Sequence, residues 1–400
     1  MHANRVNPPR GLMKMRTLLA VLVAGAMLAG CASQNGRTSG PVFFPPSPDL
    51  PRFQFLMGIN DSRDVEGRKS SLSLFSLGEA EEQKVQYLLK PYGIAAKGDV
   101  VYVCDTKTAQ VSVMDFGRKK VTQLKGNYGP GKLKKPVNLS TDREGNLYVA
   151  DVDRKEVVMF NPEGEFVMAF GKGLEMKPVD VGVDGDLLYV LDFNHSDIKI
   201  IDRQTGKLLR TAGQASDNSS DNLSLPTNMT LDARGFVYST NTTTGKVIKL
   251  DRDGHVISSF GKLGDGFGQF GRPKGIAVDD ENRIYVVDAA HQNIQVFSES
   301  GQLLMFFGDP GLPAGSLNIP AGVAISRDNL EHFQKLADPS FQVEQLVFVT
   351  NQSGNPKISI YGMGHKKGAD YEKALQETLK ERQEQLEQLK KKEDKGGDQK

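Results

Sequence analysis

The stretch KPVNLSTDREGNLYVADVDRKEVVMFNPEGEFVMAFG, residues 135–171, contains four short apolar runs separated by turn residues. Each run is too short for a helix and is bounded by Asp, Asn, Pro or Gly, which are typical of tight turns. The stretch therefore predicts four strands of one sheet. A second stretch, RPKGIAVDDENRIYVVDAAHQNIQVFSESGQLLMFFG at 272–308, repeats the same order of runs and turns.

Six units of this kind follow one another along the chain. The intervals between their first residues are 42 to 48 residues, which is the period of the blades of a β-propeller. Each unit begins at a proline, namely Pro91, Pro136, Pro178, Pro226, Pro273 and Pro320. We expect each proline to open the first strand of a blade, and the whole to form an all-β, six-bladed propeller.

A second marker supports the same division. In five units a tyrosine lies three residues before an Asp or Asn, and in the sixth Phe348 and Asn351 take those places. The pairs are Tyr102 and Asp105, Tyr148 and Asp151, Tyr189 and Asp192, Tyr238 and Asn241, and Tyr285 and Asp288. Because Asp and Asn accept backbone N–H bonds in tight turns, we interpret these residues as structural rather than catalytic.

The stretch RFQFLMG, residues 52–58, has the pattern of a fourth strand without the three strands that should come before it. The sixth unit has the complementary defect, since its third strand at 358–362 is followed by polar residues. An open ring would leave one sheet edge unpaired. We therefore predict that residues 52–58 supply the fourth strand of blade six.

Residues 135–171 and 272–308 resemble NHL repeats, and the resemblance extends over about residues 85–364. It implies a six-bladed propeller. Blade six departs from the pattern because residues 326–345 are inserted between its first two strands, where we expect a short helix that ends at Pro339.

The N-terminal segment predicts export and lipid attachment. Lys14 and Arg16 precede an apolar run, residues 17–30, that is too short to span a bilayer and is typical of a signal peptide. The ending Leu28-Ala29-Gly30-Cys31 resembles the bacterial lipobox, which implies that residues 1–30 are removed and Cys31 is acylated. Ala32 after it implies sorting to the outer membrane. The alternative is an ordinary signal peptide cut at a site of small residues.

The remaining segments complete the domain organisation. Residues 31–51 are rich in Ser, Gly and Pro and predict a flexible tether behind the lipidated cysteine, and residues 52–364 form the propeller. Residues 365–400 predict a charged helical tail, with Leu375, Leu379, Leu386 and Leu389 on one stripe. That tail is either a solvated helix or a short coiled coil that docks a partner.

Net charge and the absence of known motifs argue against several classes of function. The formal net charge of the 400 residues is +1, so no global basic field indicates nucleic acid. The chain has no CxxCH motif for covalent haem and no GxSxG, HExxH or P-loop motif. We therefore predict no cofactor and no catalytic or metal-ligating residues. His195 and His291 share one repeat position but belong to blades three and five, which makes a poor zinc site.

Two groups of polar residues are candidates for binding. The second residue after the proline is Asn138, Asp180 and Asn228 in three adjacent blades, and we expect this cluster at the central channel. It would hold either water or a calcium ion or polar ligand. The loops that enter blades two and three carry the second group, Lys132, Lys134, Lys135, Lys172 and Lys177. These lysines either keep the loops soluble or steer an acidic partner.

The sequence as a whole predicts an outer-membrane lipoprotein, attached to lipid through Cys31, whose propeller is a non-enzymatic binding scaffold for a protein or other ligand. The prefix at 45–58 followed by six repeats is similar to envelope NHL lipoproteins that accompany multihaem c-type cytochromes. That similarity implies a partner in an electron-transfer complex. The alternative is a metal-dependent lyase or hydrolase with its site at the propeller channel.

Overall fold

The computed structural model describes residues 40–67, 84–214, 221–311, 314–377 and 380. Cys31 and the predicted signal peptide lie outside these residues. From Pro41 onward the chain forms one compact unit with six sheets, five of four strands and one of five. No helix within the described ranges is long and apolar enough to cross a membrane.

The inner half of each blade follows the two sequence markers. The first strands all begin at the repeat proline, which suits a strand's first residue because it has no N–H to donate. They are β3 (Pro91–Lys97), β7 (Pro136–Thr141), β11 (Pro178–Asp184), β15 (Pro226–Leu231), β19 (Pro273–Val278) and β23 (Pro320–Ser326). The second strands all end at the repeat Asp or Asn. They are β4 (Val100–Asp105), β8 (Leu147–Asp151), β12 (Leu187–Asp192), β16 (Val237–Asn241), β20 (Ile284–Asp288) and β24 (Phe341–Asn351).

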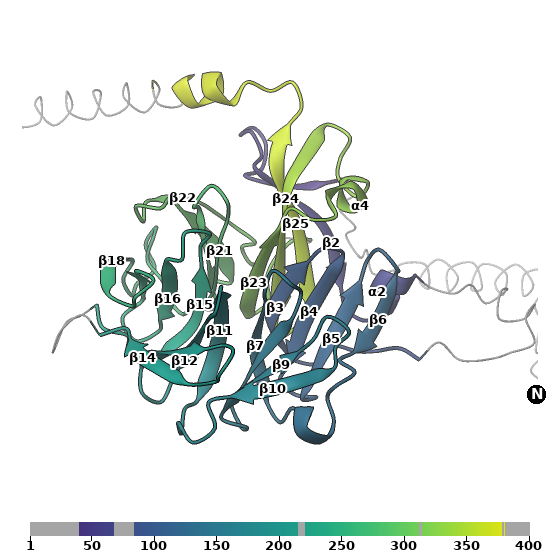
Figure 1. The fold of residues 1–400 in the computed structure, drawn as a ribbon. Coiled ribbons are helices and arrows are strands. Elements are labelled where there is room, and N and C mark those ends of the chain that lie inside the picture. Colours follow the sequence, from purple (N-terminus) through teal and green to yellow (C-terminus); the bar gives the residue numbers. More distant parts are fainter. Residues whose placement is uncertain (1–39, 68–83, 215–220, 312–313, 378–379, 381–400) are drawn as a thin grey trace, which may run out of the picture. The chain divides into compact units, whose positions relative to one another are not determined.

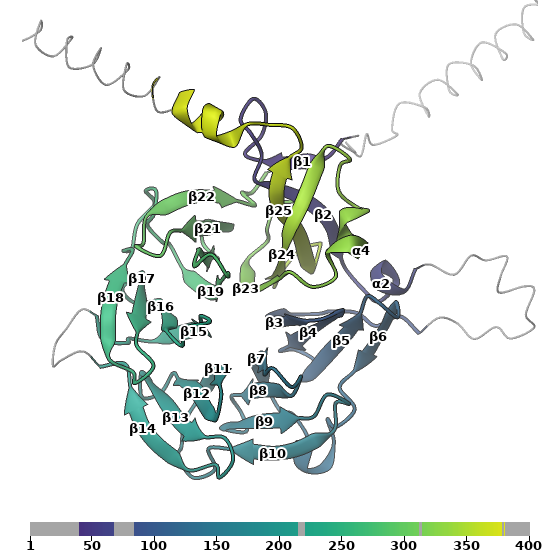
Figure 2. The same cartoon turned by 45° about the horizontal axis from the view of Figure 1, so that its top comes forward.

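The outer half of each blade pairs antiparallel with the inner half, and Figure 2 shows the blades arranged around a central channel. The third strands are β5 (Gln110–Asp115), β9 (Glu156–Phe160), β13 (Asp197–Asp202), β17 (Lys246–Leu250), β21 (Asn293–Phe297) and β25 (Ile358–Lys366). The fourth strands are β6 (Lys120–Gln123), β10 (Phe166–Phe170), β14 (Leu208–Ala212), β18 (Val256–Phe260), β22 (Leu303–Phe307) and β2 (Phe53–Ile59).

The core lies between neighbouring blades, which is why second and third strands are apolar on both faces. The repeat tyrosines Tyr148, Tyr189, Tyr238 and Tyr285 are fully buried there. Each hydroxyl has a partner: Tyr148 donates to Asp142 Oδ2 at 3.1 Å, and Tyr285 donates to Asp279 Oδ2 at 3.0 Å. A tyrosine at this position therefore fills the space between blades with its ring and forms a hydrogen bond with its hydroxyl.

Ring closure occurs as the sequence predicts. Strand β2 pairs antiparallel with β25, so the segment that contains RFQFLMG is the fourth strand of blade six. Phe53 is buried and stacks on Phe307 of blade five, with ring centroids 4.2 Å apart. The N-terminal strand thus closes blade six and also seals it against its neighbour.

The predicted tether is wrong at its C-terminal end. Residues Val42–Phe44 form strand β1, which pairs with β2 and makes blade six five-stranded. Phe44 is buried and lies edge-on to Tyr361 at 6.0 Å. The folded body therefore includes residues 42–44, because Phe43 and Phe44 pack on aromatic rings far along the chain and stabilise a strand too short for a sequence pattern to reveal.

The insertion of blade six contains the expected helix, α4 (Leu330–Gln334), although the helix ends before Pro339. Phe333 of α4 is buried against Phe116 of blade one, with ring centroids 5.1 Å apart. Figure 1 shows α4 beside the lengthened β24–β25 hairpin. A second helix, α2 (Arg63–Glu66), follows β2, and Glu66 accepts the backbone N–H of Val121 in β6 at 3.0 Å.

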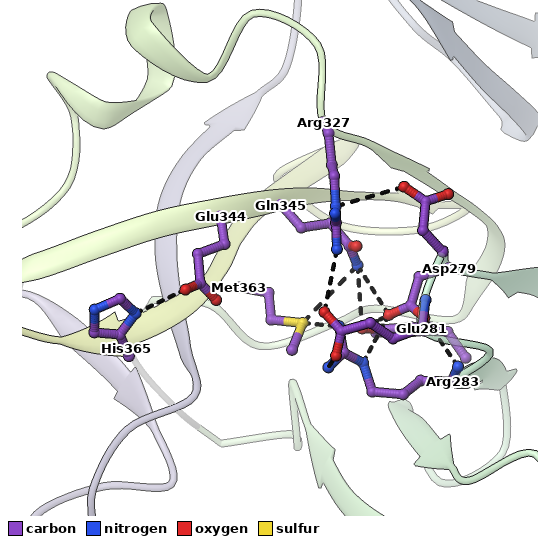
Figure 3. Close-up of polar contacts among 10 residues, drawn as sticks. Asp279, Glu281, Arg283, Arg327, Glu344, Gln345, Met363 and His365 are labelled. Carbon is purple, nitrogen blue, oxygen red and sulfur yellow. Dashed lines mark hydrogen bonds and ion pairs between the residues drawn. The ribbon is translucent and has the colours of Figure 1, made fainter. Parts of the chain in front are cut away.

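A polar network joins blades five and six on the side of the insertion (Figure 3). Gln345 of β24 donates to the Tyr285 hydroxyl at 3.1 Å, and the Arg283 guanidinium lies 2.7 Å from Asp279 Oδ2. Arg327 reaches across to Glu281 at 3.2 Å. These contacts fix the blade that is built from both ends of the chain.

The predicted tail at 365–400 begins inside strand β25, which ends at Lys366. Further along, residues 371–377 form the helix that was expected. Its first residue docks on the propeller: the Tyr371 hydroxyl donates to the carbonyl of Pro51 at 2.7 Å, and Arg52 lies over its ring at 5.1 Å. Most of the predicted helix, from residue 381 onward, lies outside the described residues.

Candidate binding site at the central channel

The first strands enclose the channel, and two cavities open along it. The face that carries the loops between first and second strands is the 1–2 face; the face that carries the loops entering each blade is the 4–1 face. A cavity of about 260 Å³ is lined by the bodies of the six first strands. A second cavity, of about 460 Å³, is lined by residues that flank the repeat prolines. We call them the 1–2 cavity and the 4–1 cavity.

The structure brings Asn138, Asp180 and Asn228 together at the wall of the 1–2 cavity, as predicted. All three side chains are buried. The Asn138 amide donates to the carbonyl of Val179 at 2.9 Å, and Asp180 Oδ2 accepts the backbone N–H of Met229 at 2.9 Å. The first two of these polar groups therefore bond the backbone of the next blade.

Asp180 is electrostatically unusual. Burial raises the pKa of its carboxyl to about 7, although hydrogen bonds from Met229, Val181 and the Asn228 side chain oppose that rise. Asn228 Oδ1 is buried without a hydrogen-bond partner. The Asn228 Oδ1 atom is thus available to accept a hydrogen bond from a water molecule or ligand, whereas Asn138 and Asp180 already bond the backbone of the next blade.

Glycine occupies the same repeat position in the other three blades, and there the ring closes by backbone contact. A Cβ on Gly275 would lie 2.5 Å from the carbonyl oxygen of Ala321, and one on Gly322 would lie 2.4 Å from the carbonyl oxygen of Tyr92. A Cβ on Gly93 would lie 2.6 Å from the Cα of Asn138. The polar side chains thus bond the next blade at two joints of the ring, and the glycines allow a close approach at three others.

The histidines sit on their own blades. His195 Nδ1 lies 2.5 Å from Asp192 Oδ2, and His291 Nδ1 lies 2.8 Å from Asp288 Oδ2. Neither histidine lines either cavity. Among the described residues, no group of three or more His, Cys, Asp or Glu side chains is placed to hold a metal ion.

The repeat aspartates accept backbone N–H bonds in the turn that follows them, as predicted: Asp151 Oδ1 accepts that of Arg154 at 3.0 Å. They also anchor the 4–1 loops, which the turn interpretation did not include. Asp151 accepts the backbone N–H groups of Lys134 at 2.7 Å and Lys135 at 3.0 Å, and Asp288 accepts that of Arg272 at 2.9 Å. Each carboxylate thereby holds the residue that precedes the proline of its own blade. The 4–1 loops are consequently anchored where they approach the channel.

The predicted lysines lie on this face. Lys132, Lys134, Lys135 and Lys172 are exposed, whereas Lys177 is half-buried with its Nζ 4.5 Å from the centroid of the Phe193 ring. The loop that enters blade four, across the ring, carries Asp217 and Asp221. Asp221 pairs with Lys246 at 2.9 Å, and Asp217 lies outside the described residues.

The 4–1 cavity brings Lys135, which was predicted, together with Lys90, Arg272 and Lys274, which the sequence interpretation missed. Lys274 lines it and is only 5% exposed, and Lys90, Lys135 and Arg272 line it as well. Burial, together with the nearby charges of Arg272 and Lys90, lowers the pKa of Lys274 to about 8. The sequence did contain a signal for this cationic cavity. The residue directly before the repeat proline is basic in four of the six units: Lys90, Lys135, Lys177 and Arg272.

Comparisons with known proteins agree with this architecture. Residues 270–297 match the model of the NHL repeat. A gluconolactonase from Xanthomonas campestris is similar in structure, with 14% identity and a TM-score of 0.51 over 81% of this chain and 94% of that one. A protein of unknown function from Bacteroides thetaiotaomicron has 15% identity and a TM-score of 0.51 over 69% and 70%. Virginiamycin B lyase from Staphylococcus aureus has 15% identity and a TM-score of 0.46 over 69% and 85%. The similarity to the first two structures, both with a TM-score above 0.5, shows the fold alone.

Proposed function

Because the chain is a six-bladed β-propeller with an NHL repeat, we propose that it is a non-enzymatic binding platform held in the bacterial outer membrane as a lipoprotein. Cys31 would carry the lipid. The 4–1 face supports the proposal: its loops are anchored by the repeat aspartates and present lysines that form no ion pair with any described carboxylate. The binding surface comprises Lys132, Lys134, Lys135, Lys172 and Lys177.

An acidic protein is the partner that this surface favours. Unpaired lysines on anchored loops attract an acidic surface over long range and lose little conformational freedom on contact. The similarity of residues 45–58 and the six repeats to envelope lipoproteins that accompany multihaem cytochromes supports a scaffold in an electron-transfer complex. A cytochrome would supply the redox centre, and this chain would position it.

Membrane attachment is tested by the variant Cys31→Ser. Removing the thiol removes the group that the lipobox resemblance implies is acylated, so the protein should move from the membrane fraction to the soluble fraction. Circular dichroism should show an unchanged propeller. A variant that still sediments with membranes would overturn the lipoprotein proposal.

Partner binding is tested by co-purification from native membranes. We expect wild-type protein to retain a protein partner, and the triple variant Lys132→Glu, Lys134→Glu, Lys135→Glu to lose it. A control with Lys97, Lys119 and Lys120 changed to Glu reverses three exposed charges on the opposite face. Equal capture by both variants would refute the role of the 4–1 lysines. A stoichiometric metal bound to the purified protein would instead favour the lyase or hydrolase alternative.

A further inference from the structure

Four cationic side chains converge on the 4–1 cavity from three blades. Lys90 and Lys135 precede the first strands of blades one and two, and Arg272 and Lys274 flank the first proline of blade five. No carboxylate lines the cavity, and none of the four forms an ion pair with any carboxylate in the part of the chain that the structure describes. Like charges gathered without a counter-ion destabilise the protein that carries them.

Lys274 destabilises the folded protein more than the other three residues do, because burial removes its ammonium group from water. Its Nζ lies 5.2 Å from the centroid of the Tyr92 ring and 3.5 Å from Gln352 Oε1, the outer limit of a hydrogen bond. An ammonium group has three donors, so most of its bonding capacity is unused. A buried cation in this condition is rare unless a ligand completes its coordination.

The aspartates nearest in the fold do not provide the missing charge. Asp288 accepts the backbone N–H groups of Gly271 at 2.7 Å and Arg272 at 2.9 Å, and it contacts His291. Asp105 accepts those of Leu89 and Lys90. Both carboxylates are therefore committed to the loops and do not line the cavity.

The rest of the lining suits a small molecule. Thr106, Thr227 and Thr242 add hydroxyl groups, while Tyr92 and Phe193 add aromatic surface. The volume of about 460 Å³ lies within the range of small-molecule sites, roughly 300–1,000 Å³. A metal cation would be repelled here, and a neutral sugar would leave Lys274 uncompensated.

We propose that the 4–1 cavity binds a small organic anion that bears carboxylate or phosphate groups. Lys274 holds the anionic group at the base of the cavity, Lys90, Lys135 and Arg272 surround it, and the aromatic rings contact its carbon skeleton. This site goes beyond the proposed platform function. It needs neither a protein partner nor the lipid anchor, so it would stand if partner capture failed.

Titration calorimetry of the purified propeller with citrate and with pyrophosphate, at constant ionic strength and pH 7, tests the site. We expect saturable binding of at least one probe, and the stronger probe identifies the carboxylate or phosphate class. In Lys274→Met the affinity should fall at least about tenfold, since a charged hydrogen bond contributes roughly 1.5–3 kcal/mol. The control Lys97→Met, on the opposite face, should bind as the wild type does.

The pH dependence separates a charged ligand contact from a structural role. As pH rises through about 8, Lys274 loses its proton and the affinity of the wild type should fall. Lys90, Lys135 and Arg272 face the same space, and Tyr92 stays neutral because burial raises its pKa. If Lys274→Met does not fold, the exposed pair Lys90→Met, Arg272→Met gives the same test. Wild-type protein that binds neither probe, or Lys274→Met that binds equally well, would overturn the proposal.

Discussion

The two ends of the central channel are built from the same six strands but differ in what their polar groups do. At the 1–2 cavity, Asn138 and Asp180 bond the backbone of the next blade. At the 4–1 cavity, Lys274 and three other cationic residues line the wall, and no carboxylate of the described residues lines it with them. The polar groups at the 1–2 end hold neighbouring blades together, whereas the cationic groups at the 4–1 end lack a neutralising charge.

This difference shows how a repeat separates stability from binding. The second residue after each proline lies in the ring, where its choice is limited to a glycine or a side chain that bonds the adjacent blade. At the 4–1 mouth the residue directly before the proline differs from blade to blade, with Lys90 in blade one and Leu225 in blade four. Ligand chemistry can thus vary at one end while closure is maintained at the other.

The largest effect is expected from a deletion that disrupts both ends of the channel. Deleting Phe53–Ile59 removes the fourth strand of blade six and the Phe53 contact with Phe307, so the ring opens and the sheet edge is unpaired. We expect aggregation or loss of the cooperative melting transition in calorimetry. Deleting Val42–Phe44 alone should lower the melting temperature less. Equal effects of the two deletions would mean that β2 does not close the ring.

Gly275→Ala should damage the 1–2 end selectively. Its new Cβ would lie 2.5 Å from a backbone oxygen that cannot rotate away. We expect a loss of about 3 kcal/mol in the free energy of unfolding, at the upper end for an overpacked site. Urea denaturation measures it. Gly40→Ala, whose Cβ would meet nothing within 4 Å, should change stability by less than about 0.5 kcal/mol. A neutral Gly275→Ala would show that blades five and six can move apart.

Asp180 should make the 1–2 end sensitive to pH. Its folded pKa of about 7 lies above the ordinary value of 3.8, so between these values the folded state holds a proton that the unfolded state has lost. Stability should therefore fall as pH rises from 5 to 7, by roughly 2 kcal/mol from this group. Denaturation of Asp180→Asn should lack that component, whereas the exposed control Asp153→Asn should retain it. An unchanged slope in Asp180→Asn would refute the assignment.

Lys274 should respond in the opposite sense at the 4–1 end. Because its folded pKa is lowered to about 8, the unfolded state binds the extra proton above that pH, and stability should rise as pH increases from 8 toward 10.5. Lys274→Met should stabilise the ligand-free protein at pH 7 by about 1 kcal/mol, because it removes a buried unpaired charge. Thermal unfolding at pH 7 and pH 10 checks this result, and a destabilised variant would show that the ammonium is already compensated.

Much of the fold could be predicted from local repetition. The prolines and the Tyr–Asp pairs mark where first strands begin and second strands end, and RFQFLMG predicts ring closure because a propeller cannot leave an edge unpaired. Strand β1 could not be predicted, since three residues carry no period and Phe44 is stabilised by Tyr361 far along the chain. The cluster of Asn138, Asp180 and Asn228 was predictable in position, but not the backbone groups that it bonds.

The sequence by itself determined the number of blades, their boundaries and the segment that completes the last one, because these follow from spacing and from the pairing of backbone hydrogen bonds. Only the tertiary structure decided that Lys90, Lys135, Arg272 and Lys274 share one cavity and that no carboxylate of the described residues lines it. Repeat position indicates that such residues lie at the same height around the ring. Whether a side chain is buried there, and whether an opposite charge reaches it, depends on contacts between blades that are distant in the chain.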